Sequence, residues 1–382
     1  MRVLHVINSL SGSGGAEQGM VREIGLLSTD IEQRLVTLYG DHSLAATVEQ
    51  AGVPISSLGL AHTRSGWNWI AGARRLEEHI NEFRPDVVHS SLTSANLVAG
   101  LATIKSRIPN LSTFTLSGDP RLVRELQPGA RTRRAALLRS VVSWVARRPH
   151  IWFRALTQDS KITNCAASKV DLDRVFVLPR GVPTPEETLT TRSSLGLPTD
   201  APILLNVARQ AAQKGHPQLI EMLSIIHNEV PAHLVILGRP GDGSRDLSLA
   251  IARWGLDQSV TVVPYTSRPF DFYLNADVFV FSSLMEGLGT AVIEAMASGI
   301  PVVAYDIPPV REATGNGRFA YLTPVGDPAA MAKAAVDVLE GNADDRSQRA
   351  TAWVKDAYSL PRIASQLESR LRELATSGSL SI

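Results

Sequence analysis

Residues 277–305 read DVFVFSSLMEGLGTAVIEAMASGIPVVAY, and the rest of the predicted fold is built outward from them. Their first apolar run, Asp277 to Ser282, is short and rich in β-formers, which predicts a buried parallel strand. A helix is expected from about Thr290 to Ser298, because Gly299 can end it. A second strand begins at Val302. A strand, a helix and a strand this close together predict a right-handed crossover in a parallel sheet.

Two carboxylates stand in this unit, Glu286 in the expected loop and Glu294 in the helix. The loop lies at the carboxyl end of a strand, where open α/β sheets bind ligands, and the amides at the helix start favour an anion. One interpretation is that both carboxylates hold ligand hydroxyl groups; the other is that Glu294 only caps a neighbouring loop. The candidate binding residues here are Glu286, Gly287, Leu288, Gly289, Thr290 and Glu294.

Residues 286–304, EGLGTAVIEAMASGIPVVA, resemble the E-x7-E signature of the retaining glycosyltransferases of family 4. The resemblance implies the GT-B fold, an α/β architecture of two Rossmann-like doubly wound domains facing a cleft. It also implies that Glu286, a candidate catalytic residue, contacts the donor sugar and that Glu294 binds the ribose of the nucleotide. Leu288 departs from the family, which usually has Phe at this position.

Composition limits the classes of function. The chain has 382 residues, 44% hydrophobic and 20% charged, which is typical of a soluble protein with two domains. A formal net charge of +1 argues against a nucleic-acid binder. The lone Cys165 excludes an internal disulfide and fits a reducing cytoplasm. We expect neither a signal peptide nor a membrane-spanning helix, because the apolar runs are too short.

Arg209 and Lys214 flank a loop that follows an expected strand at 203–208. A guanidinium offers a planar fork for phosphate and an ammonium offers a mobile point charge. Two cations on one loop can also serve solubility alone. The spacing Arg-x4-Lys-Gly resembles the diphosphate-binding pair of family 4, which implies a catalytic role in stabilising the leaving group.

A glycine-rich loop, SGSGGAEQ, follows the first expected strand, Val3 to Asn8. Such a loop before a helix is an anion site in principle. It is not a dinucleotide fingerprint, because Glu17 stands where the third glycine is required. Gly14 and Gly15 resemble the GGAE turn of family 4, which faces the interdomain cleft there, and are candidate substrate-binding residues.

Two further polar residues follow strands that the sequence predicts in the first half. His89 is expected at the carboxyl end of a strand, where it either faces a ligand or is satisfied by backbone groups. Asp119 follows a strand expected at 111–116 and is a candidate acceptor-side residue. Further strands are expected at 162–168 and 175–178.

The expected domains are an acceptor-side Rossmann-like domain over 1–183 and a nucleotide-sugar-binding Rossmann-like domain over 184–362. A C-terminal helix over 363–382 is expected to cross back to the first domain. The passage between the domains falls in a segment rich in Thr, Pro and Ser.

Residues 121–154 carry nine arginines against one acidic residue, Glu125, with Leu, Val, Trp and Phe interleaved. Clustered Arg beside Trp and Leu is typical of a helix that lies on an anionic membrane surface. A core-packed helix with a solvated basic face explains the composition equally well.

The resemblance to family 4 implies a retaining glycosyltransferase, and we expect it to act in cell-surface polysaccharide or glycolipid synthesis. The donor is a nucleoside diphosphate sugar, UDP-sugar in preference to GDP-sugar, and the acceptor is a glycan or a polyprenyl- or lipid-linked molecule. We expect no metal and no other cofactor, and a cytoplasmic protein, peripheral on the inner membrane face if the basic segment docks there. The alternatives are a hydrolysing sugar-nucleotide epimerase and a non-catalytic nucleotide-sugar-binding subunit.

Overall fold

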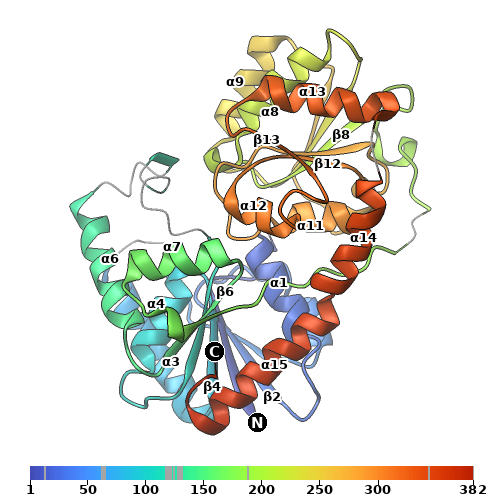
Figure 1. Ribbon diagram of the computed structural model, residues 1–382. Helices are drawn as coiled ribbons and strands as arrows, with labels where there is room; N and C mark the ends of the chain where they lie inside the picture. Colours follow the sequence, from blue (N-terminus) through green and yellow to red (C-terminus); the bar gives the residue numbers. More distant parts are fainter. Residues whose placement is uncertain are drawn as a thin grey trace. The chain divides into compact units, whose positions relative to one another are not determined.

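The computed structural model of the chain describes residues 1–12, 14–61, 66–116, 123, 125–126, 132–186, 189–342 and 345–381. The chain forms two compact units (Figure 1). Unit 1 comprises Met1–Gly181 with Leu360–Ile382, and unit 2 comprises Val182–Ser359. The sequence places these two breaks slightly later along the chain, after residues 183 and 362.

Unit 1 is built on a parallel sheet whose described strands lie in the order β3-β2-β1-β4-β5-β6-β7. The chain runs outward from β1 in one direction and then from β4 in the other, so the topological switch point lies between β1 and β4. The strands are β1 (Arg2–Ile7), β2 (Glu32–Thr37), β3 (Ile55–Ser57), β4 (Val87–Ser91), β5 (Asn110–Phe114), β6 (Ile151–Ala155) and β7 (Val175–Val177).

Alternate residues of β1 feed cores on opposite faces of this sheet, because successive side chains of a strand point to opposite sides. Leu4 and Val6 pack in one core, and Val3 packs in another with the last helix of the chain. The helices of unit 1 are α1 (Gly15–Ile24), α2 (Ala45–Gln50), α3 (Gly66–Phe83), α4 (Thr93–Ala102), α6 (Arg133–Ala146), α7 (Gln158–Ser168), the 3₁₀ turn η2 (Leu172–Arg174) and α15 (Leu360–Ser377).

Unit 2 repeats the architecture with a parallel sheet in the order β10-β9-β8-β11-β12-β13. Its switch point lies between β8 and β11, and a hydrophobic core joins these strands to α8 and α13. The strands are β8 (Ile203–Val207), β9 (His233–Leu237), β10 (Val260–Val263), β11 (Val278–Phe281), β12 (Val302–Tyr305) and β13 (Tyr321–Thr323). The helices are η3 (Ser193–Leu195), η4 (Ala212–Lys214), α8 (His216–Ile226), α9 (Ser244–Trp254), α10 (Pro269–Tyr273), α11 (Thr290–Ala297), α12 (Pro308–Ala313), α13 (Pro328–Asp337), η5 (Val338–Asn342) and α14 (Arg346–Ala357).

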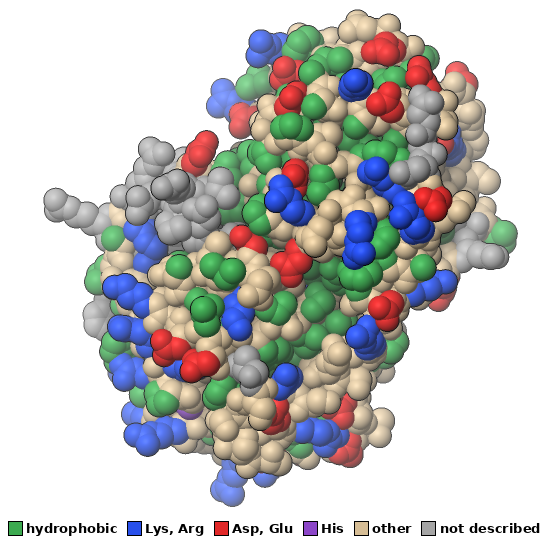
Figure 2. All heavy atoms as spheres, viewed as in Figure 1, with side chains coloured by type: hydrophobic (Ala, Val, Ile, Leu, Met, Phe, Trp, Pro, Cys, Tyr) green, Lys and Arg blue, Asp and Glu red, His purple; other side chains and the backbone are tan. Residues whose placement is uncertain are grey.

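Two doubly wound parallel α/β sheets confirm the fold class that the sequence predicts. Charged side chains of both signs are interspersed over the visible face of each unit, consistent with the near-zero net charge (Figure 2). No helix among the described residues is long and apolar enough to span a bilayer.

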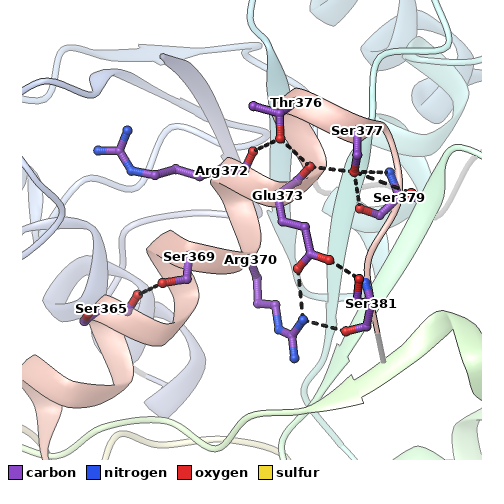
Figure 3. Close-up of polar contacts among 9 residues, drawn as sticks. All are labelled: Ser365, Ser369, Arg370, Arg372, Glu373, Thr376, Ser377, Ser379 and Ser381. Atoms are coloured by element: carbon purple, nitrogen blue, oxygen red, sulfur yellow. Dashed lines mark hydrogen bonds and ion pairs between the residues drawn. The ribbon is translucent and has the colours of Figure 1, made fainter.

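Helix α15 belongs to unit 1, where Ile363, Leu367, Leu371 and Leu374 are buried in the core that contains Val3 of β1. The end of the chain folds back on this helix, as Figure 3 shows. The backbone N–H of Ser381 donates to Glu373, and Arg370 donates to the carbonyl oxygen of Ser381 at 2.7 Å. These contacts give the last residues fixed polar partners.

The segment 162–168 is helical rather than extended, so the strand expected there is wrong. It lies in α7, whose N-cap Thr157 accepts a hydrogen bond from the backbone N–H of Ser160. An N-cap of this kind satisfies one of the free amides at a helix start. The apolar residues of the segment face different environments, because Ile162 is 54% exposed whereas Cys165 is buried.

Arg154 is fully buried in β6 and so is not part of the basic surface expected over 121–154. Its guanidinium donates to both carboxylate oxygens of Glu23, at 2.8 and 2.7 Å. Burial opposes ionisation of Glu23, but Arg154 and the nearby Arg180 outweigh it and lower the pKa of this carboxyl. A paired buried charge of this kind is costly to disrupt.

Candidate functional site

The loop after β8 and the loop after β11 are joined at the switch point of unit 2. The hydroxyl of Ser282 lies 2.9 Å from the carbonyl oxygens of both Lys214 and Gly215 and donates to them. The backbone N–H of Leu284 donates to the carbonyl of Gln213 at 2.8 Å. Gly215 has a φ of +65°, and a Cβ there would lie 2.3 Å from the carbonyl oxygen of Ser282. Only glycine fits this position, so the Lys-Gly pair of the sequence is explained by the packing.

Lys214 and Glu286, predicted from separate motifs, form an ion pair with Nζ 2.5 Å from Oε1. Their side chains are only 16% and 10% exposed. The ammonium also lies 5.8 Å from the ring centroid of Phe281, within cation–π range. A largely shielded pair is screened less by salt than a surface pair. The structure thus brings together the cation and the carboxylate that the sequence places in one site.

Helix α11 begins beside this pair. Its N-cap Gly289 has a φ of +83°, a conformation that suits glycine, and Gly287 and Leu288 before it are buried. The first amides of a helix have no intrahelical acceptor, and the helix dipole adds partial positive charge there. The amides from Leu288 to Thr290 are therefore placed to receive an anion.

Glu294, 7% exposed, lies one turn into α11 and also has a specific partner in unit 2. The hydroxyl of Tyr273, in α10, lies 3.2 Å from Oε2 of Glu294 and donates to it. The sequence gives no indication of this partner, because the two residues lie on different helices.

Arg209 follows β8 on the same loop as Lys214, is exposed, and forms no ion pair with the described residues. A third loop, between β9 and α9, supports the backbone on either side of it. A Cβ on Gly238 would lie 1.9 Å from the carbonyl oxygen of Ala208, and one on Gly241 would lie 2.5 Å from that of Gln210. The sequence has three glycines over 238–243, and their close spacing could have indicated this supporting loop.

In unit 1, the glycine-rich loop is held by Glu17. Its carboxylate accepts hydrogen bonds from Ser9 at 2.7 Å, from Ser11 at 2.9 Å and from the backbone N–H of Gly14 at 3.2 Å. Gly14 is the N-cap of α1, and Gly15 is the first residue of this helix. Glu17 therefore fixes the loop that carries the two candidate glycines at the switch point of the first sheet.

The sequence predicts His89 at the end of its strand, and this is wrong. His89 is buried two residues before the end of β4. Its Nδ1 lies 3.1 Å from Nδ1 of His5, and Nε2 of His5 lies 3.0 Å from the side-chain oxygen of Gln33. Burial lowers the pKa of His5 to about 4 and that of His89 well below its usual value. Both rings are therefore neutral near pH 7. Nδ1 of His89 contacts His5 on the neighbouring strand, whereas its Nε2 is buried without a hydrogen-bond partner among the described residues.

Asp119 lies outside the described residues. Within the described part of the chain, no three His, Cys, Asp or Glu side chains are grouped so that they could hold a metal ion.

Two family matches cover most of the chain. Residues 187–359 match the family described as glycosyl transferases group 1. Residues 24–181 match the glycosyl transferase 4-like domain. The first match contains Lys214, Glu286 and Glu294, and the second contains His89.

Curated relatives share about three residues in ten. A D-inositol 3-phosphate glycosyltransferase from Xylanimonas cellulosilytica is 29% identical over 311 residues, which are 73% of this chain and 69% of the relative. A GDP-mannose:cellobiosyl-diphosphopolyprenol alpha-mannosyltransferase from Xanthomonas campestris is 29% identical over 219 residues, or 54% of this chain and 58% of the relative.

Solved structures show the same fold. Anabaena Alr3699/HepE in complex with UDP-glucose has a TM-score of 0.81 at 19% identity, and the likeness covers 98% of this chain and all of that one. A sucrose-phosphate synthase from Thermosynechococcus elongatus also has a TM-score of 0.81, at 17% identity, with coverage of 98% and 99%.

Proposed function

Because the chain belongs to the GT-B glycosyltransferases, with a 4-like and a group 1 domain, we propose that it is a retaining transferase of a sugar from a nucleoside diphosphate sugar. The observation that supports this most is the Lys214–Glu286 pair beside the start of α11. The switch point of unit 2 thus has a cation for the diphosphate, helix amides that can also bind it, and a carboxylate for sugar hydroxyl groups.

In this proposal different residues of unit 2 bind different parts of the donor. The diphosphate lies at the amides from Leu288 to Thr290 and draws Lys214 away from Glu286. Arg209, which is exposed on the same loop, adds a second cation. Glu286 then accepts hydrogen bonds from the sugar, and Glu294 accepts them from the ribose. Each charged contact contributes about 1.5–3 kcal/mol.

The proposed reaction breaks the bond between the anomeric carbon and the diphosphate oxygen while the acceptor oxygen bonds to the same face of that carbon. The acceptor proton passes to the departing phosphate oxygen, so the products are the glycoside and the nucleoside diphosphate. Lys214, Arg209 and the helix amides stabilise the negative charge that develops on the leaving group. These groups supply positive charge without a metal ion, and no carboxylate is required as a nucleophile.

We propose UDP as the nucleotide in preference to GDP. The Anabaena structure contains UDP-glucose, whereas the Xanthomonas relative is named for GDP-mannose, so both nucleotides occur among similar proteins. The acceptor is proposed to be a glycan or a lipid-linked molecule, and the Xanthomonas relative is named for a diphosphopolyprenol acceptor.

A lipid-linked acceptor requires contact with a membrane, and α6 carries a surface suited to an anionic one. Leu137, Val141 and Trp144 are 68%, 37% and 45% exposed and follow one another at helical spacing. The guanidinium of Arg148 lies 3.7 Å above the ring of Trp144. Figure 2 shows Lys and Arg side chains beside apolar ones along the edge of unit 1 that carries α6. We propose that this stripe inserts at the headgroup level while the arginines face anionic lipid.

Vesicle co-sedimentation tests the membrane contact. Each Arg near an anionic surface contributes about 1 kcal/mol, screened by salt. Binding should therefore need anionic lipid, fall with salt, and weaken in Trp144→Ser and Arg147→Glu. Arg245→Glu, on the exposed surface of unit 2, is the charge-matched control. Equal pelleting with neutral and anionic vesicles would leave α6 as an ordinary basic helix.

The function itself is tested with a panel of UDP- and GDP-sugars, each incubated with and without polyprenyl-linked glycan acceptors. A transferase releases nucleoside diphosphate in an acceptor-dependent manner and yields a product with the anomeric configuration of the donor. A hydrolysing epimerase releases the diphosphate from donor alone, and a non-catalytic subunit binds the donor without release. Inversion of configuration would contradict the proposed reaction.

A further inference from the structure

A buried tyrosine sits directly behind one of the two candidate carboxylates. Tyr273 is the last residue of α10 and is fully buried. Its hydroxyl lies 3.2 Å from Oε2 of Glu294 and 3.3 Å from the carbonyl oxygen of Ala291. A phenol has one proton to donate, and an ionised carboxylate can only accept. The tyrosine is therefore the donor toward Glu294, and its single proton is shared between this carboxylate and the carbonyl oxygen of Ala291, at a place that water reaches poorly.

Neighbouring aromatic rings fix the direction of this hydroxyl. The ring of Tyr273 lies 5.6 Å from that of Phe270 and 5.7 Å from that of Phe279, both in tilted contact. Phe279 in turn stacks on Phe281 at 5.9 Å. Phe279 and Phe281 belong to β11, the strand that leads into the Glu286 loop. The rigid sheet thus sets the position of the tyrosine oxygen, and the tyrosine oxygen sets that of the carboxylate.

We infer that Tyr273 is a positioning residue for Glu294 and thereby sets how strongly the site prefers ribonucleotides over deoxyribonucleotides. The inference rests on the proposed function, in which Glu294 accepts hydrogen bonds from ribose hydroxyls. A carboxylate gains affinity for a hydroxyl group only when its oxygen is already held at hydrogen-bonding distance and angle. Without the phenol, Glu294 loses the hydrogen bond that holds Oε2, so its carboxylate is held less firmly toward the ribose.

The test is calorimetric titration of UDP, 2′-deoxy-UDP and 3′-deoxy-UDP, and of the GDP series if UDP does not bind. The variants are Tyr273→Phe, Glu294→Ala and the double substitution. Tyr305→Phe is the matched control, because Tyr305 is also fully buried in the sheet of unit 2, in β12. Thermal unfolding of each variant reports on stability separately.

The native chain should prefer UDP over at least one deoxy analogue by about 10-fold to 100-fold, the range for a hydrogen bond to a charged group. Tyr273→Phe should lower this preference several-fold. Glu294→Ala should abolish it, and the double variant should match Glu294→Ala, because the tyrosine acts through the carboxylate. Tyr305→Phe should keep the native preference.

The outcomes separate this inference from the function on which it rests. A native preference in Tyr273→Phe, with only a lower unfolding temperature, would make the tyrosine purely structural and overturn the inference. If Glu294→Ala still prefers UDP over its deoxy analogues, then Glu294 does not bind the ribose. That result would also overturn the inference, but it would leave the proposed binding of the nucleotide intact. Failure of the native chain to bind either UDP or GDP would overturn the proposed function and the inference together.

Discussion

Glu286→Gln is expected to tighten the binding of free UDP while it greatly slows sugar transfer. Lys214 Nζ lies 2.5 Å from Oε1 of Glu286, so a diphosphate must replace this carboxylate as the partner of the ammonium. Glutamine removes the competing charge and its repulsion of the phosphates. It also weakens the acceptor that the sugar hydroxyls need.

The size of the effect follows from the strength of the pair that UDP must break. A hydrogen bond to a charged group contributes about 1.5–3 kcal/mol, and the pair is only 10–16% exposed, so solvent offsets little of it. The lower bound corresponds to UDP binding about tenfold tighter. Lys214→Ala should have the opposite effect and weaken UDP binding by a similar factor.

Calorimetric titration of UDP into the native chain and the two variants measures this directly, with turnover assayed in parallel. Glu229→Gln, on an exposed residue of unit 2, is the control for loss of one negative charge. Weaker UDP binding in Glu286→Gln, or equal tightening in Glu229→Gln, would refute competition between carboxylate and diphosphate for Lys214.

Three further substitutions test unit 1. Glu17→Ala should raise hydrogen exchange over residues 9–16, because three donors lose their acceptor; unchanged exchange would show that Glu17 does not hold the loop. Arg154→Met should cost roughly 3–5 kcal/mol in urea unfolding, since it leaves Glu23 buried with its main partner gone; a loss below about 1 kcal/mol would contradict this. The free energy of unfolding should fall by roughly 3 kcal/mol on account of His5 as the pH drops from about 6.5 to 4. In this range His5 becomes protonated in the unfolded chain but stays neutral in the folded one, because burial lowers its pKa. His5→Gln should flatten that pH dependence, and an equally steep profile in the variant would assign it to other groups.

The sequence predicts the sheets well where a strand is buried on both faces. The run from Asp277 to Ser282 contains β11, and its end fixes the loop that holds Glu286. Such strands have an uninterrupted apolar pattern that no surface helix shares. The segment 162–168 has a similar apolar content but belongs to α7, because a cap at Thr157 and a half-solvated face decide its structure. Composition over seven residues does not contain that information.

The candidate site could be predicted where its residues belong to short local motifs. The spacing that follows β8 and the two carboxylates of 286–294 are local, and the structure joins them through Lys214 and Glu286. Tyr273 could not be predicted, because its contact with Glu294 depends on how α10 packs against α11. His89 was misplaced for a related reason: the length of β4 is set by pairing with β1, where His5 lies opposite His89.

A crystal structure of the chain with UDP tests the central proposal most directly. The diphosphate is expected at the amides from Leu288 to Thr290, with Nζ of Lys214 moved from Glu286 to a phosphate oxygen and a ribose hydroxyl donating to Glu294. A nucleotide bound elsewhere in unit 2, with the Lys214–Glu286 pair intact, would contradict it.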